Sequence, residues 1–139
     1  MDESKEYIEM CRKATEIQKA WQPHWGDFIE GDNDGVVTII SVGQTTYIMY
    51  ILVESQIVWL PRQDQLQGML KDYDKWTPLY WIRRFKGFSQ SLYNSWEIER
   101  LETMTMDKLW LMFVMRENFK KKWDGKEWID SAIFPADSL

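Results

Sequence analysis

The predicted architecture depends first on one segment, Met106-Asp107-Lys108-Leu109-Trp110-Leu111-Met112-Phe113-Val114-Met115. Thr105 can cap a helix that begins at Met106, and this helix would be apolar on nearly every side from Leu109 to Met115. We therefore expect it to be the central and most buried helix, running to about Lys122. Lysines 120 to 122 complement the dipole of its C-terminal end, and Gly125 can supply the left-handed stop.

Two more helices are expected before it. Pro61 suits a first helical position, and apolar residues recur behind it at helical spacing. Thr77-Pro78 is a stronger start, because an N-cap hydroxyl precedes a proline at N1. The apolar stripe of this helix consists of Trp81, Phe85, Phe88, Leu92 and Trp96.

The N-terminal third predicts one helix followed by strands. Residues recur every three or four positions from Tyr7 to Trp21, and Pro23 ends that helix. A turn then enters a short strand at residues 25–29, and two β-rich runs cover 36–42 and 45–53 with Gly43-Gln44 as the hairpin turn. A further short run covers Ile57 to Leu60. The connections are too short for crossovers, which favours an antiparallel meander of three to four strands.

Together these elements predict an α+β fold: an N-terminal helix, a small antiparallel meander, and three helices packed on that sheet. The length of 139 residues suits a single domain over 1–139, whose tail from 130 to 139 lacks periodicity and is expected to fray. The only cysteine, Cys11, favours a reducing compartment. No apolar run is long enough to cross a bilayer, and the acidic N-terminus does not resemble a signal peptide, so we expect a cytoplasmic protein without a membrane partner.

Nine tryptophans give the chain large contact surfaces without an accompanying catalytic set. Trp59, Trp81, Trp96 and Trp110 lie within apolar stripes or strands, and we expect them in the core. Four others lie at element ends among polar or turn residues and are candidates for an exposed protein-interaction patch: Trp25, Trp76, Trp123 and Trp128. If the last three form one patch, a homodimer is a plausible form of the protein.

The segment from Trp76 to Trp96 interleaves basic and aromatic residues. Arg83, Arg84, Lys86 and Trp76 can bind phosphates and stack on bases, so nucleic-acid binding is an alternative function. The same residues also suit an amphipathic helix with solvated bases, and the net charge of −5 favours that interpretation.

Catalytic and metal sites find little support in the sequence. His24 has no nearby Ser, Cys or acid in a recognisable constellation, and Asp27 suits a turn. An unrecognised hydrolase that uses His24, Asp27 or glutamates brought together by folding is the second alternative. Asp32 and Asp34 begin like a calcium loop, but the pattern fails at the last ligand position. One His and one Cys cannot build the usual zinc site, so we expect no cofactor and no metal.

Four sequence blocks taken together resemble a known group of proteins. They are Trp21-Gln22-Pro23 with Gly26-Asp27, the run from Trp59 to Gln67, the helix from Met106 to Met115, and Lys122-Trp123-Asp124-Gly125-Lys126-Glu127-Trp128. In this order and spacing they resemble small uncharacterised proteins of phages and prophages of Gram-positive, often clostridial, bacteria. The resemblance implies an accessory protein without an assigned activity. We therefore expect a non-enzymatic phage-type accessory or protein-interaction domain.

Overall fold

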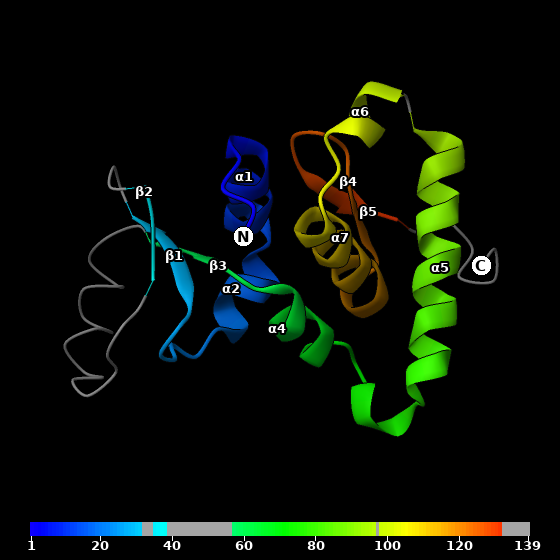
Figure 1. Cartoon of the computed structure of the whole chain (residues 1–139), viewed down its shortest axis with the longest axis horizontal. Helices are drawn as coiled ribbons and strands as arrows, with labels where there is room; N and C mark the ends of the chain where they lie inside the picture. The colour runs from blue at the N-terminus through cyan, green and yellow to red at the C-terminus, as the bar shows by residue number, and fades with distance from the viewer. Residues whose placement is uncertain (32–34, 39–56, 97, 132–139) are drawn as a thin grey trace. The chain divides into compact units, whose positions relative to one another are not determined.

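A computed structural model describes residues 1–31, 35–38, 57–96 and 98–131 (Figure 1). The fold is α+β, as predicted, and the chain divides into two compact units, Met1–Arg62 (unit 1) and Gln63–Leu139 (unit 2). Unit 1 contains α1 (Lys5–Lys13), α2 (Thr15–Ala20), β1 (Phe28–Gly31), β2 (Gly35–Thr38) and β3 (Val58–Leu60). Unit 2 contains α4 (Gln63–Gly68), the 3₁₀ turn η1 (Tyr73–Lys75), α5 (Pro78–Ser95), α6 (Ile98–Glu102), α7 (Met106–Phe119), β4 (Lys121–Trp123) and β5 (Trp128–Asp130).

In unit 1 a three-stranded antiparallel sheet has β1 in its centre, between β2 and β3 (Figure 1). The described strands are thus not in the sequential order of a meander. The predicted strand over 45–53 and its hairpin turn at Gly43-Gln44 lie outside the described residues. Helix α1 packs on β3, and the Tyr7 hydroxyl donates to the carbonyl oxygen of Pro61 at 2.8 Å. Pro61 therefore ends the strand region and does not begin a helix, which starts two residues later at Gln63.

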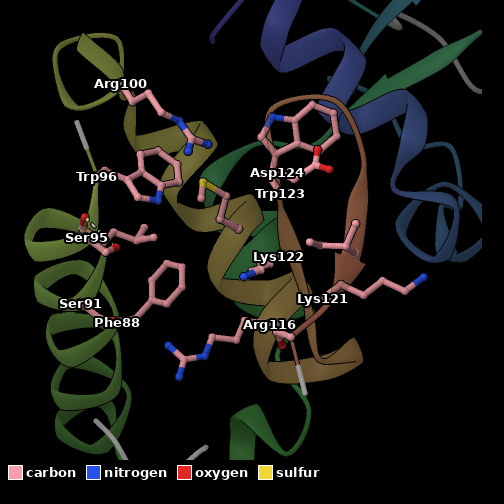
Figure 2. Close-up of a pocket in the computed structure, with 14 residues that line it drawn as sticks. Phe88, Ser91, Ser95, Trp96, Arg100, Arg116, Lys121, Lys122, Trp123 and Asp124 are labelled. Atoms are coloured by element: carbon pink, nitrogen blue, oxygen red, sulfur yellow. Dashed lines mark hydrogen bonds between the residues drawn. The ribbon is translucent and has the colours of Figure 1, made fainter. Parts of the chain in front are cut away.

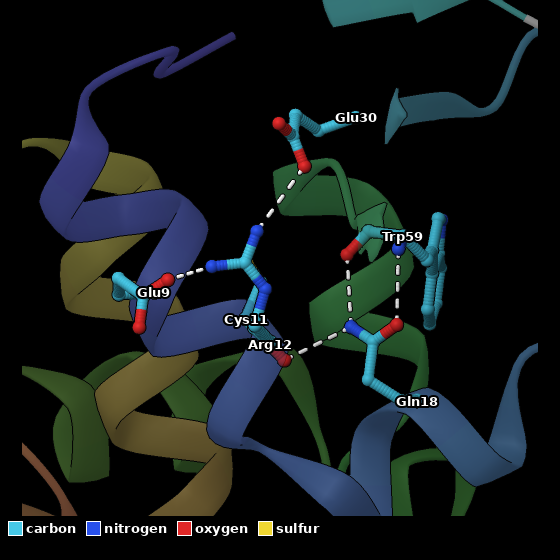
Figure 3. Close-up of polar contacts among 6 residues, drawn as sticks. All are labelled: Glu9, Cys11, Arg12, Gln18, Glu30 and Trp59. Atoms are coloured by element: carbon cyan, nitrogen blue, oxygen red, sulfur yellow. Dashed lines mark hydrogen bonds and ion pairs between the residues drawn. The ribbon is translucent and has the colours of Figure 1, made fainter. Parts of the chain in front are cut away.

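The first predicted helix is divided at Ala14 into α1 and α2. Its apolar stripe is confirmed from Tyr7 to Ile17, because those stripe residues are buried, but Trp21 is only half-buried. Ala14 has a backbone φ of −80° and ψ of 70°, which is not helical. The break leaves the Cys11 carbonyl available to a side chain, and the Gln18 amide donates to it at 3.0 Å. The same amide group exchanges two hydrogen bonds with the backbone of Trp59, both at 2.9 Å (Figure 3).

In unit 2 helix α7 is buried, as predicted. All residues from Trp110 to Met115 are buried, and Leu109 is half-buried. Phe113 lies at the centre of an aromatic cluster with ring centroids within 6.5 Å of it, formed by Trp81, Phe85, Phe88 and Trp110. This cluster joins α5 to α7. Helix α4 also packs on α7, and Asn118 of α7 both donates to the Met69 carbonyl at 2.6 Å and accepts from the Lys71 N–H at 2.8 Å.

The predicted helix starts are confirmed more closely than the helix ends. Thr77 and Thr105 are N-caps, whose hydroxyl oxygens accept from the Tyr80 and Lys108 backbone N–H groups. The prediction that α7 extends to about Lys122 is wrong, because the helix ends at Phe119 and Lys120 adopts a left-handed conformation with φ 57°. Lys121 and Lys122 instead begin an antiparallel hairpin of β4 and β5. Gly125 has φ 106° in the turn of this hairpin.

Candidate functional site

A pocket of about 330 Å³ lies entirely within unit 2 (Figure 2). Its sides come from the C-terminal half of α5, from α6 and α7, and from the β4–β5 hairpin. These elements meet there because the α5–α7 aromatic cluster positions the two helices, and β4 continues directly from α7 and packs on it. Apolar side chains dominate the wall, including Leu92, Met112 and Ile129, and aromatic rings complete it with Phe88, Trp96 and Trp123.

The charged lining of the pocket is mainly basic, with four bases and one acid: Arg100, Arg116, Lys121, Lys122 and Asp124. The two guanidinium groups lie at opposite ends of the pocket in Figure 2. Arg100 lies 3.8 Å above the ring of Trp96, and Arg116 lies 5.4 Å from the ring centre of Phe88. Both distances are typical of cation–π contacts, which fix a guanidinium over an aromatic face.

Two carboxylates near Arg116 and the pocket, those of Glu117 and Asp124, are engaged elsewhere. Glu117 follows Arg116 in sequence, and the Arg84 guanidinium donates to both of its oxygens, at 2.8 and 3.0 Å. Asp124 accepts from the backbone N–H groups of Lys126 and Glu127, both at 2.7 Å. In the described part of the chain, no carboxylate lies within ion-pairing distance of Arg100 or Arg116.

The electrostatics of the pocket follow from these contacts. Burial lowers the pKa of the Arg116 guanidinium from its ordinary value; Glu117 opposes this change and Arg84 adds to it. The backbone N–H donors of Glu127 and Lys126 hold the pKa of Asp124 below its ordinary value of 3.8. Arg116 is thus a partly desolvated cation, and the Asp124 carboxylate is committed to the hairpin turn.

A second candidate surface lies on the solvent side of α5. We call it the α5 outer face, and it consists of Leu79, Ile82, Arg83, Lys86 and Tyr93. At 3.6 residues per turn these positions fall within about 100° of one another around the helix axis. Leu79 is 77% exposed, Ile82 is 63% exposed and Tyr93 is 66% exposed. No Asp or Glu occurs anywhere in α5.

The three basic residues of α5 that were predicted to bind nucleic acid do not lie on one surface. Arg83 and Lys86 are exposed on the α5 outer face, as a solvated amphipathic helix requires. Arg84 points to the opposite side of the helix and is engaged by Glu117 of α7. Its charge therefore contributes to packing within unit 2, and only Arg83 and Lys86 present theirs to solvent.

The four candidate contact tryptophans also divide. Trp25 of unit 1 is 73% exposed, and Trp76 of unit 2 is 45% exposed and stacks on Tyr80 with ring centroids 4.5 Å apart. Trp123 is only 5% exposed, so it packs in the core and does not contribute to an exposed patch. It is buried because the hairpin register places it opposite Trp128, whose half-buried ring lies 5.2 Å from it. Of the tryptophans predicted for the core, three are buried and Trp96 is half-buried in the pocket wall.

His24 and Asp27 lie in one turn of unit 1. Asp27 is buried, and its Oδ2 accepts from the indole N–H of Trp21 and from the backbone N–H of His24, both at 2.8 Å. Arg62 donates to the Gly26 carbonyl at 3.0 Å and lies 3.6 Å from Asp27. The exposed His24 ring is 2.7 Å from the carbonyl oxygen of Gln22. Asp27 therefore stabilises this turn of unit 1 through its hydrogen bonds and its contact with Arg62.

None of the helices within the described ranges combines the length and apolar character that a bilayer crossing requires. Among the same residues, His, Cys, Asp and Glu side chains do not gather in groups of three or more that could hold a metal ion.

Sequence reasoning missed the pocket and its two arginines. Arg100 belongs to a five-residue helix that the sequence does not predict, and Arg116 lies in α7, the helix that the sequence predicts as the buried centre of the fold. They come from different elements, and no motif spacing links them to Phe88 or Trp96. The sequence also carries no charge signal for them, because Arg100 lies between Glu99 and Glu102 and Arg116 is followed directly by Glu117.

Comparison with protein-family models, with curated proteins and with solved structures finds no match to this chain.

Proposed function

We propose that this chain is a non-enzymatic protein-interaction domain and that the α5 outer face is its contact surface. The observation that carries this proposal is the exposure of Leu79, Ile82 and Tyr93 on one side of a helix that contains no acid. Large apolar side chains gathered on one face are typical of interaction sites, whereas single exposed ones are ordinary. Trp76 precedes the N-cap of the same helix and adds an exposed aromatic ring.

The chemistry of the α5 outer face indicates the kind of partner it fits. Arg83 and Lys86 lie between the apolar residues, so the surface is apolar and positive at once. A protein surface with an apolar ridge flanked by Asp or Glu would cover the exposed carbon and pair with both bases. Electrostatic complementarity of this kind increases association rate and specificity. We therefore infer an acidic, amphipathic segment of a partner protein.

A photo-crosslinking residue in place of Leu79 tests the proposal in cells of the source organism. We expect one protein to be captured and, once purified, to bind the full chain directly. Ile82→Asp should weaken that purified interaction by at least roughly tenfold, because it places a carboxylate in the apolar centre of the contact and against an acidic partner. The readout is the Kd from calorimetric titration.

Met106→Asp is the matched control, since Met106 is another exposed apolar residue of unit 2 but belongs to α7. It should leave the Kd unchanged. An affinity that Ile82→Asp and Met106→Asp affect equally would contradict the assignment of the surface. Capture of a second copy of this chain would identify the homodimer as the form of the interaction.

Nucleic-acid binding is the second candidate function. Its specific support is the exposed pair Arg83 and Lys86, together with the Lys75 ammonium 5.8 Å from the ring of Trp76. Phosphate contacts release counterions, so binding of a single-stranded oligonucleotide would weaken steeply as salt increases. Arg83→Gln combined with Lys86→Gln should then reduce the salt slope, whereas a slope of zero in the parent chain excludes this candidate.

We further propose the biological setting that the four sequence blocks imply: a phage or prophage accessory protein in the bacterial cytoplasm. The single cysteine, which is buried in α1, is compatible with a reducing compartment. Trp25 of unit 1 is a further contact candidate. Genes for phage replication, packaging or regulation beside the coding gene would support this origin, and a housekeeping operon would contradict it.

A further inference from the structure

The pocket of unit 2 is not used by the proposed protein contact, because its lining includes none of the five residues of the α5 outer face. Its volume of about 330 Å³ lies at the lower end of the range of about 300–1,000 Å³ that is usual for small-molecule sites. A largely apolar wall with a few fixed polar groups is also usual for such sites. The cavity thus has the size and composition of a site for a small organic molecule.

The basic side chains of the pocket indicate that its ligand carries a negative charge. A guanidinium that stacks on an aromatic ring still points its N–H donors outward in its own plane, where they can bind a carboxylate or a phosphate in a bidentate manner. Arg100 lies at stacking distance from Trp96, 3.8 Å above its ring, and Arg116 lies within cation–π range of Phe88, 5.4 Å from its ring centre. The cation–π contacts fix the two side chains before a ligand arrives, which reduces the entropy lost on binding.

Neither Asp124, the acid of the pocket lining, nor Glu117, which follows Arg116 in sequence, pairs with these two arginines. Both oxygens of Glu117 accept from Arg84, and Asp124 accepts from two backbone N–H groups. Arg116 is the stronger anion-binding candidate because it is partly desolvated, and an ion pair gains energy as the surrounding dielectric falls. Figure 2 shows the Lys122 side chain between the arginine ends of the pocket, whereas the Lys121 side chain extends away from it.

We propose that this pocket binds a small organic anion that has a planar apolar body, with its carboxylate or phosphate on Arg116. The apolar body covers Leu92 and Met112 and extends toward Trp123. Arg100, at the other end over Trp96, contributes positive potential and a second polar contact for a ligand that is charged at both ends. Carboxylate and phosphate present the same chemistry to a guanidinium, and the two are separated experimentally.

Calorimetric titration of the full chain with four probes tests this site. The probes are 2-naphthoate, 1-naphthyl phosphate, the neutral 2-naphthalenemethanol and inorganic phosphate. We expect 1:1 binding of at least one naphthyl anion, with the neutral alcohol and inorganic phosphate each at least about tenfold weaker, because each lacks one of the two contacts. The tighter of the two naphthyl anions shows which headgroup the pocket accommodates better.

Variants then locate the bound anion. Arg116→Gln should weaken the tighter probe by about tenfold or more, and Arg116→Lys, which keeps the charge but not the planar fork, should weaken it less. Arg100→Gln should have a smaller effect than Arg116→Gln. Ile129→Glu adds an acid to the pocket lining at a partly exposed position and should also abolish binding of either anion. This exposed variant serves as the test should Arg116→Gln fail to fold.

Arg83→Gln is the matched control, since it removes an equal charge from the same unit but lies on the α5 outer face. It should leave the probe affinity unchanged and weaken only the protein partner. The absence of binding by both naphthyl anions would overturn the proposal, and so would equal losses with Arg83→Gln and Arg116→Gln. Neither outcome bears on the α5 outer face, so the two proposals fail independently.

Discussion

In unit 1 the side chain of Gln18 forms hydrogen bonds with backbone groups of two other residues. The Gln18 amide exchanges hydrogen bonds with the N–H and C=O of Trp59 and donates to the Cys11 carbonyl, as Figure 3 shows. Arg12 pairs with Glu9 of its own helix and with Glu30 of β1, the latter at 3.3 Å. The partly buried hydrogen bonds of Gln18 contribute more to stability than the ion pairs of Arg12, because exposed ion pairs contribute little.

Gln18→Ala should lower the free energy of unfolding by about 2–3 kcal/mol, because the N–H and C=O of Trp59 both lose their partner and the Cys11 carbonyl loses one donor while it keeps its bond from the Ala14 N–H. Urea denaturation followed by circular dichroism measures the change. Gln22→Ala, an exposed glutamine in the same unit, should change it by less than about 0.5 kcal/mol. Similar effects of the two substitutions would show that the Gln18 hydrogen bonds do not stabilise the fold.

Asp124 gives unit 2 a pH dependence at acidic pH. The pKa of its carboxyl group is lowered below 3.8 by backbone N–H donors, so the folded state favours the ionised form. Its stabilising contribution is fully present above pH 3.8 and is lost as the pH falls through the folded-state pKa. Carboxyl NMR should give a titration midpoint below 3.8 for Asp124.

Asp124→Asn should therefore unfold more readily than the parent chain at neutral pH and equally readily near the acid end of the titration. Lys126→Ala keeps the backbone donor to Asp124 and should preserve the pH dependence. Equal stability of Asp124→Asn and the parent chain at neutral pH would contradict this role of the carboxylate.

Among the elements, the two helix starts with an N-cap threonine could be predicted from sequence, whereas the start at Pro61 and the end of α7 could not. Thr77-Pro78 and Thr105 specify N-caps by local chemistry, since one hydroxyl and the next few residues suffice. The end of α7 depends on the hairpin that follows, because the Ser131 N–H donates to the Lys120 carbonyl at 2.7 Å. That contact closes a turn eleven positions away, and local propensity cannot reveal it.

Lys120→Gly should stabilise the protein by about 0.5–1 kcal/mol, because a side chain in the left-handed region is strained and glycine is not. The neighbouring Lys121→Gly should have the opposite sign, since Lys121 is in β4 and glycine weakens an extended strand. Thermal unfolding of the two variants measures both shifts. Shifts of the same sign would contradict the conformational explanation.

The candidate site was also harder to predict than the helices, because it depends on contacts between elements that are distant in sequence. The stripe of α5 predicted which side is buried, and the exposed positions of Arg83 and Lys86 follow from it. Arg84 is only one residue further along, yet its role depends on Glu117 of another helix. The burial of Trp123 likewise depends on hairpin register. Sequence periodicity therefore located the faces of helices, whereas partners between elements required the structure.

Across the whole molecule, charge is divided unequally between the two units. Unit 1 contains ten acids and five bases, whereas unit 2 contains twelve of each. The net charge of −5 therefore belongs to unit 1, and the basic pocket and the α5 outer face belong to the neutral unit. Unit 2 therefore has positive surfaces because some of its bases are clustered, and not because it contains more bases than acids.

A single domain over 1–139 predicts one cooperative unfolding transition for the whole chain. In calorimetry the measured enthalpy should equal the van't Hoff enthalpy, and variants in either unit should shift the same transition. Gln18→Ala in unit 1 and Asn118→Ala in unit 2 are a suitable pair, because each removes side-chain bonds to the backbone. Two transitions, each shifted by only one variant, would show that the units unfold independently.

The contacts of Gln18 have a further consequence for how copies of this chain meet one another. An exposed β-strand edge can recruit strands from other molecules and begin amyloid-like growth. At Trp59 a strand from another molecule cannot pair, because the Gln18 amide already occupies the backbone N–H and C=O of this residue. One glutamine thereby acts as a terminator of sheet extension at this position and favours association through other surfaces.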